Sequence, residues 1–231
     1  MPNFSTLDFY KAYTTNVQDF LVAEKEIKRT INRALKENKQ NTVKIQTKLY
    51  SLLYSTYSES SFMKMILTPY GFEQDYINEI LNQRSIQEKW YKVLELGFKK
   101  FKSNSKSSEI PNKKQELKKI IREFIIDPSL IRNKVAHGQI SVVLNRKNDA
   151  INVGLTKQIE DLNVVYVSRL FEVNKSMVSI IEDLIESPDK AHYAYYHQKY
   201  QNMQNFINKS SSWDIESKMK TKSMSKNILR K

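Results

Sequence analysis

The sequence predicts an all-α protein: a bundle of helices with one small β-hairpin late in the chain and an extra helix towards the C-terminus. Apolar residues recur three or four positions apart over several long stretches, which is the spacing of an amphipathic helix. Two of these stretches begin with a serine followed three residues later by an acid, a typical helix start. Only residues 140–153 have β-like character.

The first two helices are expected to be long. Ser5 and Asp8 form a capping pair, and the helical pattern continues from there to about Asn38. A second helix is expected from about Thr42 to Leu67, and its core stripe consists of Ile45, Leu49, Leu52, Leu53, Met63 and Ile66. The short polar link between the two helices favours an antiparallel helical hairpin.

Glu59 falls on or beside the apolar stripe of the second helix. A half-buried carboxylate needs a partner, so Glu59 is a candidate to hold Arg132 or orient His137. The alternative, which we favour, places Glu59 at the edge of the stripe with its carboxylate in water.

Two shorter helices are expected at 73–83 and 86–101, and Ser85 with Glu88 is a capping pair for the second. A basic segment follows, which contains Lys99, Lys100 and Lys102. These lysines either complement the helix dipole or contact an RNA backbone. A further basic helix, 114–126, leads into the most informative stretch of the chain.

That stretch is 127–138, Asp-Pro-Ser-Leu-Ile-Arg-Asn-Lys-Val-Ala-His-Gly. Asp127 can cap a helix, Pro128 suits the first helical position, and Gly138 can end the helix in the left-handed conformation. Asn133 and His137 are four residues apart and share a helix face. Arg132 and His137 are five apart and diverge by roughly 140°. A second copy packed across a two-fold axis would bring them together more easily.

The segment Arg132-Asn133-Lys134-Val135-Ala136-His137 resembles the arginine–polar–x–x–x–histidine motif of HEPN-domain ribonucleases, in particular standalone bacterial nucleases of phage-defence and toxin–antitoxin systems. The resemblance covers about eight residues and the all-helical setting. It implies a HEPN-like bundle and a metal-independent endoribonuclease that needs no cofactor. It also implies a homodimer with a composite active site.

The resemblance assigns catalytic roles to Arg132, Asn133 and His137. His137 exchanges protons with the RNA, Arg132 neutralises charge on the phosphoryl oxygens, and Asn133 holds His137 or the phosphate. Lys134, Arg146 and Lys147 join the lysines of 99–102 as candidate RNA-binding residues. Some HEPN toxins carry a tyrosine two residues after the histidine, which a partner enzyme adenylylates. Gln139 stands there in this chain, so the sequence does not support that form of control.

After Gly138 the pattern predicts two short strands, 140–144 and 151–153, joined by a turn that carries Arg146 and Lys147. The last core helix is expected to start at Thr156 or Asp161 and to run to about Ser187. The chain is thereby divided into a HEPN-like domain (1–187), a Tyr-rich helix (188–208) and a basic, flexible tail (209–231). We interpret the Tyr-rich helix first as an ordinary packing helix, with base stacking or a dimer seam as alternatives.

The formal net charge of +13 favours a polyanionic partner, most simply RNA. The chain has no cysteine and only three scattered histidines, so no metal site is expected. Neither a signal peptide nor a membrane-spanning stretch is evident, which leads us to expect a cytoplasmic protein without a membrane partner. The main alternative function is a non-catalytic helical subunit that binds RNA or docks on an antitoxin, ATPase or sensor of a defence complex.

Overall fold

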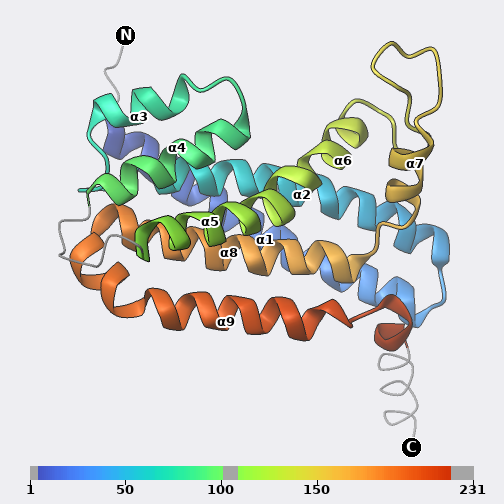
Figure 1. The fold of residues 1–231 in the computed structure, drawn as a ribbon. Coiled ribbons are helices and arrows are strands. Elements are labelled where there is room, and N and C mark those ends of the chain that lie inside the picture. The colour runs from blue at the N-terminus through green and yellow to red at the C-terminus, as the bar shows by residue number, and fades with distance from the viewer. Residues whose placement is uncertain (1–4, 101–108, 220–231) are drawn as a thin grey trace, which may run out of the picture.

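Two long antiparallel helices, α1 (Thr6–Lys36) and α2 (Gln40–Ile66), form one side of the molecule (Figure 1). The computed structural model describes residues 5–100 and 109–219, except for the side chains of Glu109, Leu130 and Arg132. The other elements are, in chain order, α3 (Gln74–Leu81), α4 (Ile86–Lys99), α5 (Glu109–Ile121), η1 (Arg122–Ile126), α6 (Asp127–Ala136), α7 (Val153–Glu160), α8 (Val164–Glu186), η2 (Pro188–His192) and α9 (Tyr193–Ser211). In the described ranges every regular element is helical, which confirms the predicted all-α class.

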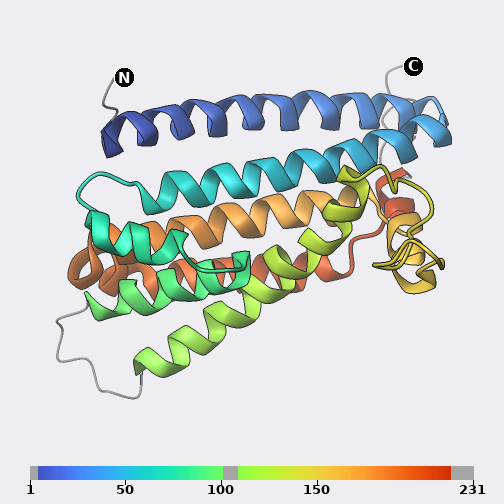
Figure 2. The same cartoon turned by 90° about the horizontal axis from the view of Figure 1, so that it is seen from above.

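The long helices lie side by side along one axis of the molecule (Figures 1 and 2). Helix α2 packs between α1 and α8, and α9 packs against α8. Helices α4 and α5 cover the bundle, and α6 continues from α5 across α2. The predicted hairpin of two long helices is therefore confirmed, and α8 completes the core around it.

The start signals read from the sequence are confirmed at two helices. Ser5 and Asp8 form a reciprocal capping box at α1, and Ser85 and Glu88 form one at α4. In each box the serine hydroxyl accepts a backbone N–H and the acid accepts the N–H of the serine. These contacts span only three residues, which explains why the sequence alone reveals them.

The core stripe that we predicted for α2 is wrong in its first half. The side chains of Ile45 and Leu49 are 54% and 42% exposed. The buried face instead carries tyrosines and small hydroxyl residues: Thr47, Tyr50, Ser51, Tyr54, Ser55, Tyr57, Ser58 and Ser61. Small side chains at helical spacing allow α1 and α8 to approach α2 closely, and the tyrosines fill the space between them.

The tyrosines of α2 converge on Phe171 of α8. The ring centroids of Tyr50, Tyr54 and Tyr57 lie 5.1, 5.2 and 5.0 Å from that of Phe171. Such aromatic pairs add about 0.5–1.5 kcal/mol each beyond the area they bury. This cluster, and not the aliphatic residues of the predicted stripe, joins α2 to α8.

The predicted β-hairpin is not formed. In its place the structure has a single antiparallel bridge between Leu144 and Ile151. Asn152 accepts the backbone N–H of Leu155 through its side chain and so starts helix α7, which leaves no room for a return strand. Helix α7 is also separate from α8, because Asn163 caps α8 with hydrogen bonds from the N–H groups of Val165 and Tyr166.

The Tyr-rich segment is a packing helix, as the first of our three interpretations predicts. Tyr196 is 2% exposed and donates a hydrogen bond from its hydroxyl to Oε2 of Glu116 at 3.1 Å. Helix α9 runs to Ser211, so the boundary that we predicted at 208 falls inside it. Residues 215–219 form a further helical turn, and Ile215 packs against the core. The rest of the basic tail, 220–231, lies outside the described residues.

We expect the buried His192 to make the fold sensitive to acid. Burial and the nearby ammonium of Lys113 lower the pKa of His192 to about 4 from an ordinary value of 6.5. The unfolded chain therefore binds the proton more readily than the folded chain as pH falls from 6.5 to 4, and folding is weakened by about 3 kcal/mol at pH 4. Chemical denaturation at several pH values measures this loss.

The controls for this prediction are two further variants. His192→Leu removes the titrating group, so its stability should fall less steeply over the same pH range. His197→Gln alters an exposed histidine on α9, the helix that begins after His192, and should follow the wild type. Equal slopes for wild type and His192→Leu would contradict the prediction.

Candidate functional site

The motif helix α6 is the last part of one continuous helix that begins at α5. We predicted a separate start capped by Asp127, and this is wrong: Ile126 before it is helical and no side chain caps the turn. Pro128 instead produces a local π-helical turn, because proline has no N–H to donate to the carbonyl of Phe124. The N–H of Asp127 bonds to the carbonyl of Arg122, five residues back.

The carbonyl that Pro128 leaves without its helical partner is satisfied from α2. The Tyr54 hydroxyl donates to the carbonyl oxygen of Phe124 at 2.7 Å. Burial raises the pKa of Tyr54 above its ordinary value, so this hydroxyl keeps its proton and stays a donor. The hydroxyl of Ser129 donates to the carbonyl of Ile126 at 2.6 Å. The start of α6 is thus held to the core at a defined angle.

The other end of α6 has the predicted glycine stop. Gly138 adopts a φ of 82°, its N–H bonds to the carbonyl of Val135, and the N–H of Gln139 bonds to the carbonyl of Lys134. These two bonds form a Schellman motif that satisfies the last carbonyls of the helix. They fix the backbone on both sides of His137, which is the C-cap residue.

Gly138→Ala should therefore lower the free energy of unfolding by about 1 kcal/mol, because alanine is strained at positive φ. A Cβ at this position meets no atom within 4 Å, so the effect is one of backbone conformation and not of packing. Gly154→Ala is the matched control, since Gly154 lies inside α7 and its Cβ would have room. That change should stabilise the protein slightly. Urea denaturation of both variants tests the opposite signs.

His137 and Asn133 are both exposed on the outer face of α6, as their spacing predicts. His137 is an exposed residue, and its imidazole has no hydrogen-bond partner in the described part of the chain. The backbone of Arg132 lies on the preceding turn of α6, while its side chain is not described. Glu59 is exposed on α2 and lines a small cavity with Pro128 and Ser129 at the start of α6.

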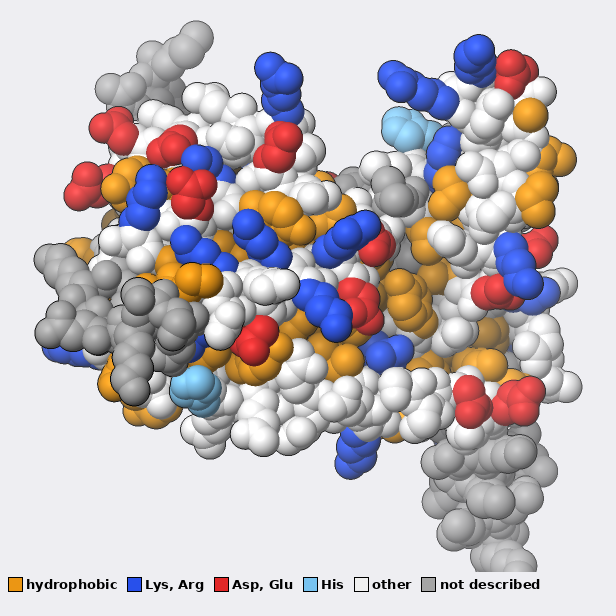
Figure 3. Space-filling model, in the orientation of Figure 1, with side chains coloured by type: hydrophobic (Ala, Val, Ile, Leu, Met, Phe, Trp, Pro, Cys, Tyr) orange, Lys and Arg blue, Asp and Glu red, His pale blue; other side chains and the backbone are white. Residues whose placement is uncertain are grey.

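The end of the molecule that carries α6, α7 and residues 139–152 projects from the bundle (Figure 1). In Figure 3 a recess separates this end from α3 and α4, and Lys and Arg side chains lie with a His at its outer tip. Arg146 and Lys147 are exposed in the turn beside the Leu144–Ile151 bridge. They remain candidates for contact with a polyanion near α6.

Lys134, predicted to contact RNA, forms a structural contact beside the motif helix. Its Nζ donates to the carbonyl oxygen of Leu144 at 3.0 Å, and the side-chain oxygen of Gln139 accepts the N–H of Leu144 at 2.9 Å. Val135, Val143 and Ile159 form a small buried cluster beneath these bonds. Together these contacts hold residues 139–144 against the end of α6.

The C-terminal end of α4, which carries Lys99 and leads to Lys100, lies at the opposite end of the bundle from α6 (Figures 1 and 2). Lys100 donates to the carbonyl oxygens of Gly71 and Ile185 at 2.7 and 2.8 Å, and burial lowers its pKa. Lys99 is exposed and pairs with Glu95 at 3.3 Å. Lys102 lies outside the described residues. The structure therefore does not bring Lys99 or Lys100 together with His137, and Lys100 forms structural contacts.

Two other lysines lie beside the segment that follows α6, and the sequence analysis missed them. Lys44 and Lys48 are on α2, and they line a cavity of about 360 Å³ together with Ser141. The Nζ of Lys48 is 3.5 Å from the hydroxyl of Ser141, just after α6. Their spacing of four residues predicts a shared helix face, but not which element that face meets.

Comparisons with protein-family models, with curated proteins and with solved structures find no match to this chain. Among residues 5–100 and 109–219, no group of three or more His, Asp or Glu side chains is arranged to hold a metal ion. No described helix is both long enough and apolar enough to cross a membrane.

Proposed function

We propose that this protein is a metal-independent endoribonuclease of the HEPN type that acts as a toxin or phage-defence effector. The observation that carries the proposal is the state of His137. Its imidazole is exposed and free to exchange protons, while the backbone around it is held by the Schellman motif. A histidine that only stabilised the fold would be expected to bury its ring or to bond a neighbouring group.

The chemistry needs only the RNA, water and side chains from α6 and its C-cap. His137 accepts the proton of a ribose 2′-hydroxyl, and the 2′-oxygen forms a bond to the adjacent phosphorus. The P–O5′ bond breaks, and the leaving 5′-oxygen takes a proton from solvent. Arg132 neutralises the charge that builds on the phosphoryl oxygens, and Asn133 orients His137 or the phosphate. The products carry a 2′,3′-cyclic phosphate and a 5′-hydroxyl.

The proposal includes a homodimer in which Arg132 of one copy meets His137 of the other. Helix geometry supports this, since residues five apart diverge on one helix. The surface beside α6 supports it as well, because four apolar side chains are exposed there: Ile45, Leu49, Ile140 and Val142. The contact between Lys48 and Ser141 shows that segment 140–142 lies beside this part of α2. Such a patch is typical of a protein interface.

Ile45→Glu should therefore convert the protein to a monomer, because a charge buried in an interface is strongly unfavourable. Val22→Glu is the matched control, since Val22 is 58% exposed on α1 and lies away from this patch. Light scattering after size-exclusion chromatography measures the mass of both variants. A dimer that survives Ile45→Glu, or a wild type that is already a monomer, would rule out this interface.

The function is tested by incubating the protein with labelled single-stranded RNA in EDTA, beside the same sequence made with 2′-deoxyribose. Cleavage of the RNA alone, with cyclic-phosphate ends, is the expected result. If the deoxy substrate is cut equally well, the 2′-hydroxyl is not the nucleophile and the mechanism is wrong. Binding of the RNA without cleavage would point instead to a non-catalytic RNA-binding subunit.

A further inference from the structure

A large cavity lies between α1, α8 and the end of α9, on elements other than the motif helix. Its volume is about 590 Å³, within the range of pockets that bind small organic ligands. Helix α8 contributes residues on one face, α1 contributes Lys28, and the segment after α9 closes one side. The lining residues used in the argument below are Val165, Ser168, Arg169, Phe206, Ser212 and Trp213.

One wall of this cavity is aromatic. Trp213 is 49% exposed and meets Phe206 edge to face, with 5.8 Å between the ring centroids. Val165 adds an apolar surface from α8. An exposed indole that is held against a second ring offers a flat face on which a planar group can stack.

The cavity also has a positive charge, that of Arg169, and its lining includes two carboxylates, those of Glu172 and Asp214. Arg169 donates from Nε to the Ser210 hydroxyl at 2.9 Å and from Nη2 to the carbonyl of Ile207 at 3.5 Å. No carboxylate within the described chain forms an ion pair with it. The guanidinium has five N–H donors, so three remain for a ligand. The carbonyls at the end of α9 offset only part of its charge.

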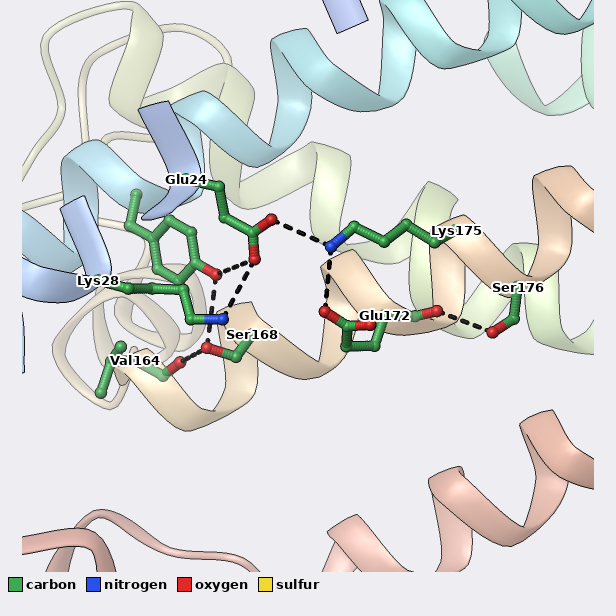
Figure 4. Close-up of polar contacts among 8 residues, drawn as sticks. Glu24, Lys28, Val164, Ser168, Glu172, Lys175 and Ser176 are labelled. Atoms are coloured by element: carbon green, nitrogen blue, oxygen red, sulfur yellow. Dashed lines mark hydrogen bonds and ion pairs between the residues drawn. The ribbon is translucent and has the colours of Figure 1, made fainter. Parts of the chain in front are cut away.

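The neighbouring charges are already balanced and do not neutralise Arg169. Figure 4 shows Glu24 between Lys28 and Lys175, and Glu172 beside Lys175. The Nζ–carboxylate distances are 3.3 Å for Lys28–Glu24 and 3.0 Å for both Lys175–Glu24 and Lys175–Glu172. Asp214 and Lys218, one acid and one base, also line the cavity. The three lysines are thus matched in number by three acids, and the surplus positive charge equals that of Arg169.

Hydroxyl groups of the lining are oriented to accept hydrogen bonds. Ser168 donates its hydroxyl proton to the carbonyl of Val164 at 2.8 Å, and Ser212 donates to that of Lys209 at 3.3 Å. The Ser168 oxygen also lies 3.4 Å from the Tyr50 hydroxyl, so one of its lone pairs is left for a ligand. The oxygen lone pairs of both serines are therefore what they offer to a ligand. A sugar hydroxyl is a suitable donor to such an oxygen.

We propose that this cavity binds a nucleoside monophosphate, with the base against Trp213 and Phe206 and the phosphate on Arg169. A planar ring, a donor-rich sugar and an anion are the three chemical features that the lining matches. A one-ring aromatic acid would leave much of the cavity empty. This site does not depend on the proposed ribonuclease activity, because none of its residues belongs to α6.

The fluorescence of Trp213 can be used to measure ligand binding in the cavity. The chain has two tryptophans, and Trp90 is fully buried, so a ligand that enters the cavity should change the fluorescence of Trp213. Titration of the full-length protein with AMP should give a saturable change, whereas adenosine and inorganic phosphate should each bind at least tenfold more weakly. Arg169→Ala should weaken AMP binding about tenfold or more. Arg29→Ala, a change of an exposed arginine on α1, should leave it unaltered.

Two outcomes would overturn the proposal. The first is the absence of both a fluorescence change and calorimetric heat with AMP up to about 1 mM. The second is equal binding of AMP and adenosine, since Arg169 would then have no role with the phosphate. This comparison uses the wild-type protein, so it stands even if Arg169→Ala fails to fold.

Discussion

Replacing Glu24 with alanine is expected to lower the free energy of unfolding by about 2–3 kcal/mol. Glu24 is 4% exposed and joins three helices through its carboxylate. It accepts a hydrogen bond from the Tyr50 hydroxyl of α2 at 3.2 Å and pairs with Lys28 of α1 and Lys175 of α8. Its removal leaves the ammonium of Lys175 with Glu172 alone in a half-buried position. The two lysines keep about a third of their side chains exposed, which limits the loss.

Glu26→Ala is the matched control for Glu24→Ala. Glu26 lies on the same helix and pairs with Arg29, but both of these side chains are largely exposed. Its replacement should change stability by less than about 0.5 kcal/mol. Urea denaturation of the two variants measures the difference. Equal effects would mean that the buried carboxylate is no more important to the fold than a surface ion pair.

Some local signals in the sequence are confirmed by the structure, whereas the Asp127 cap and the hairpin at 140–153 are not. The capping boxes and the glycine stop of α6 depend on residues at most five positions apart, so no knowledge of the fold was needed. The buried face of α2 depends on what packs against it. Hydropathy alone favoured Ile45 and Leu49 over tyrosines and serines, although Phe171 and the close approach of α1 and α8 select the latter.

In the candidate site, too, some features could be predicted from local sequence and others could not. The shared face of Asn133 and His137 follows from helix geometry and is found in the structure. The role of each lysine cannot be predicted from the sequence around it. A lysine that bonds a backbone carbonyl and a lysine that could bind a phosphate have the same sequence pattern. Lys134 and Lys100 donate hydrogen bonds to backbone carbonyls. Lys44 and Lys48 lie beside the segment that follows α6.

His137→Ala should reduce RNA cleavage by roughly 10²–10⁴-fold, the typical contribution of a general acid–base group. Stability should change little, because the ring is exposed and has no described hydrogen bond. His197→Ala, a change of the other exposed histidine, should cleave RNA at the wild-type rate. Full activity in purified His137→Ala would remove His137 from the mechanism, whatever other activity the protein has.

Mixing two inactive variants then distinguishes a composite site from one within a single chain. Arg132→Ala and His137→Ala should each be inactive alone. If each site uses Arg132 of one copy and His137 of the other, a mixed dimer has one intact site and one that lacks both groups. Random exchange of subunits makes half of the dimers mixed, so activity should return to roughly a quarter of the wild-type level. A site within one chain has no such route, because every chain in the mixture lacks one of the two groups.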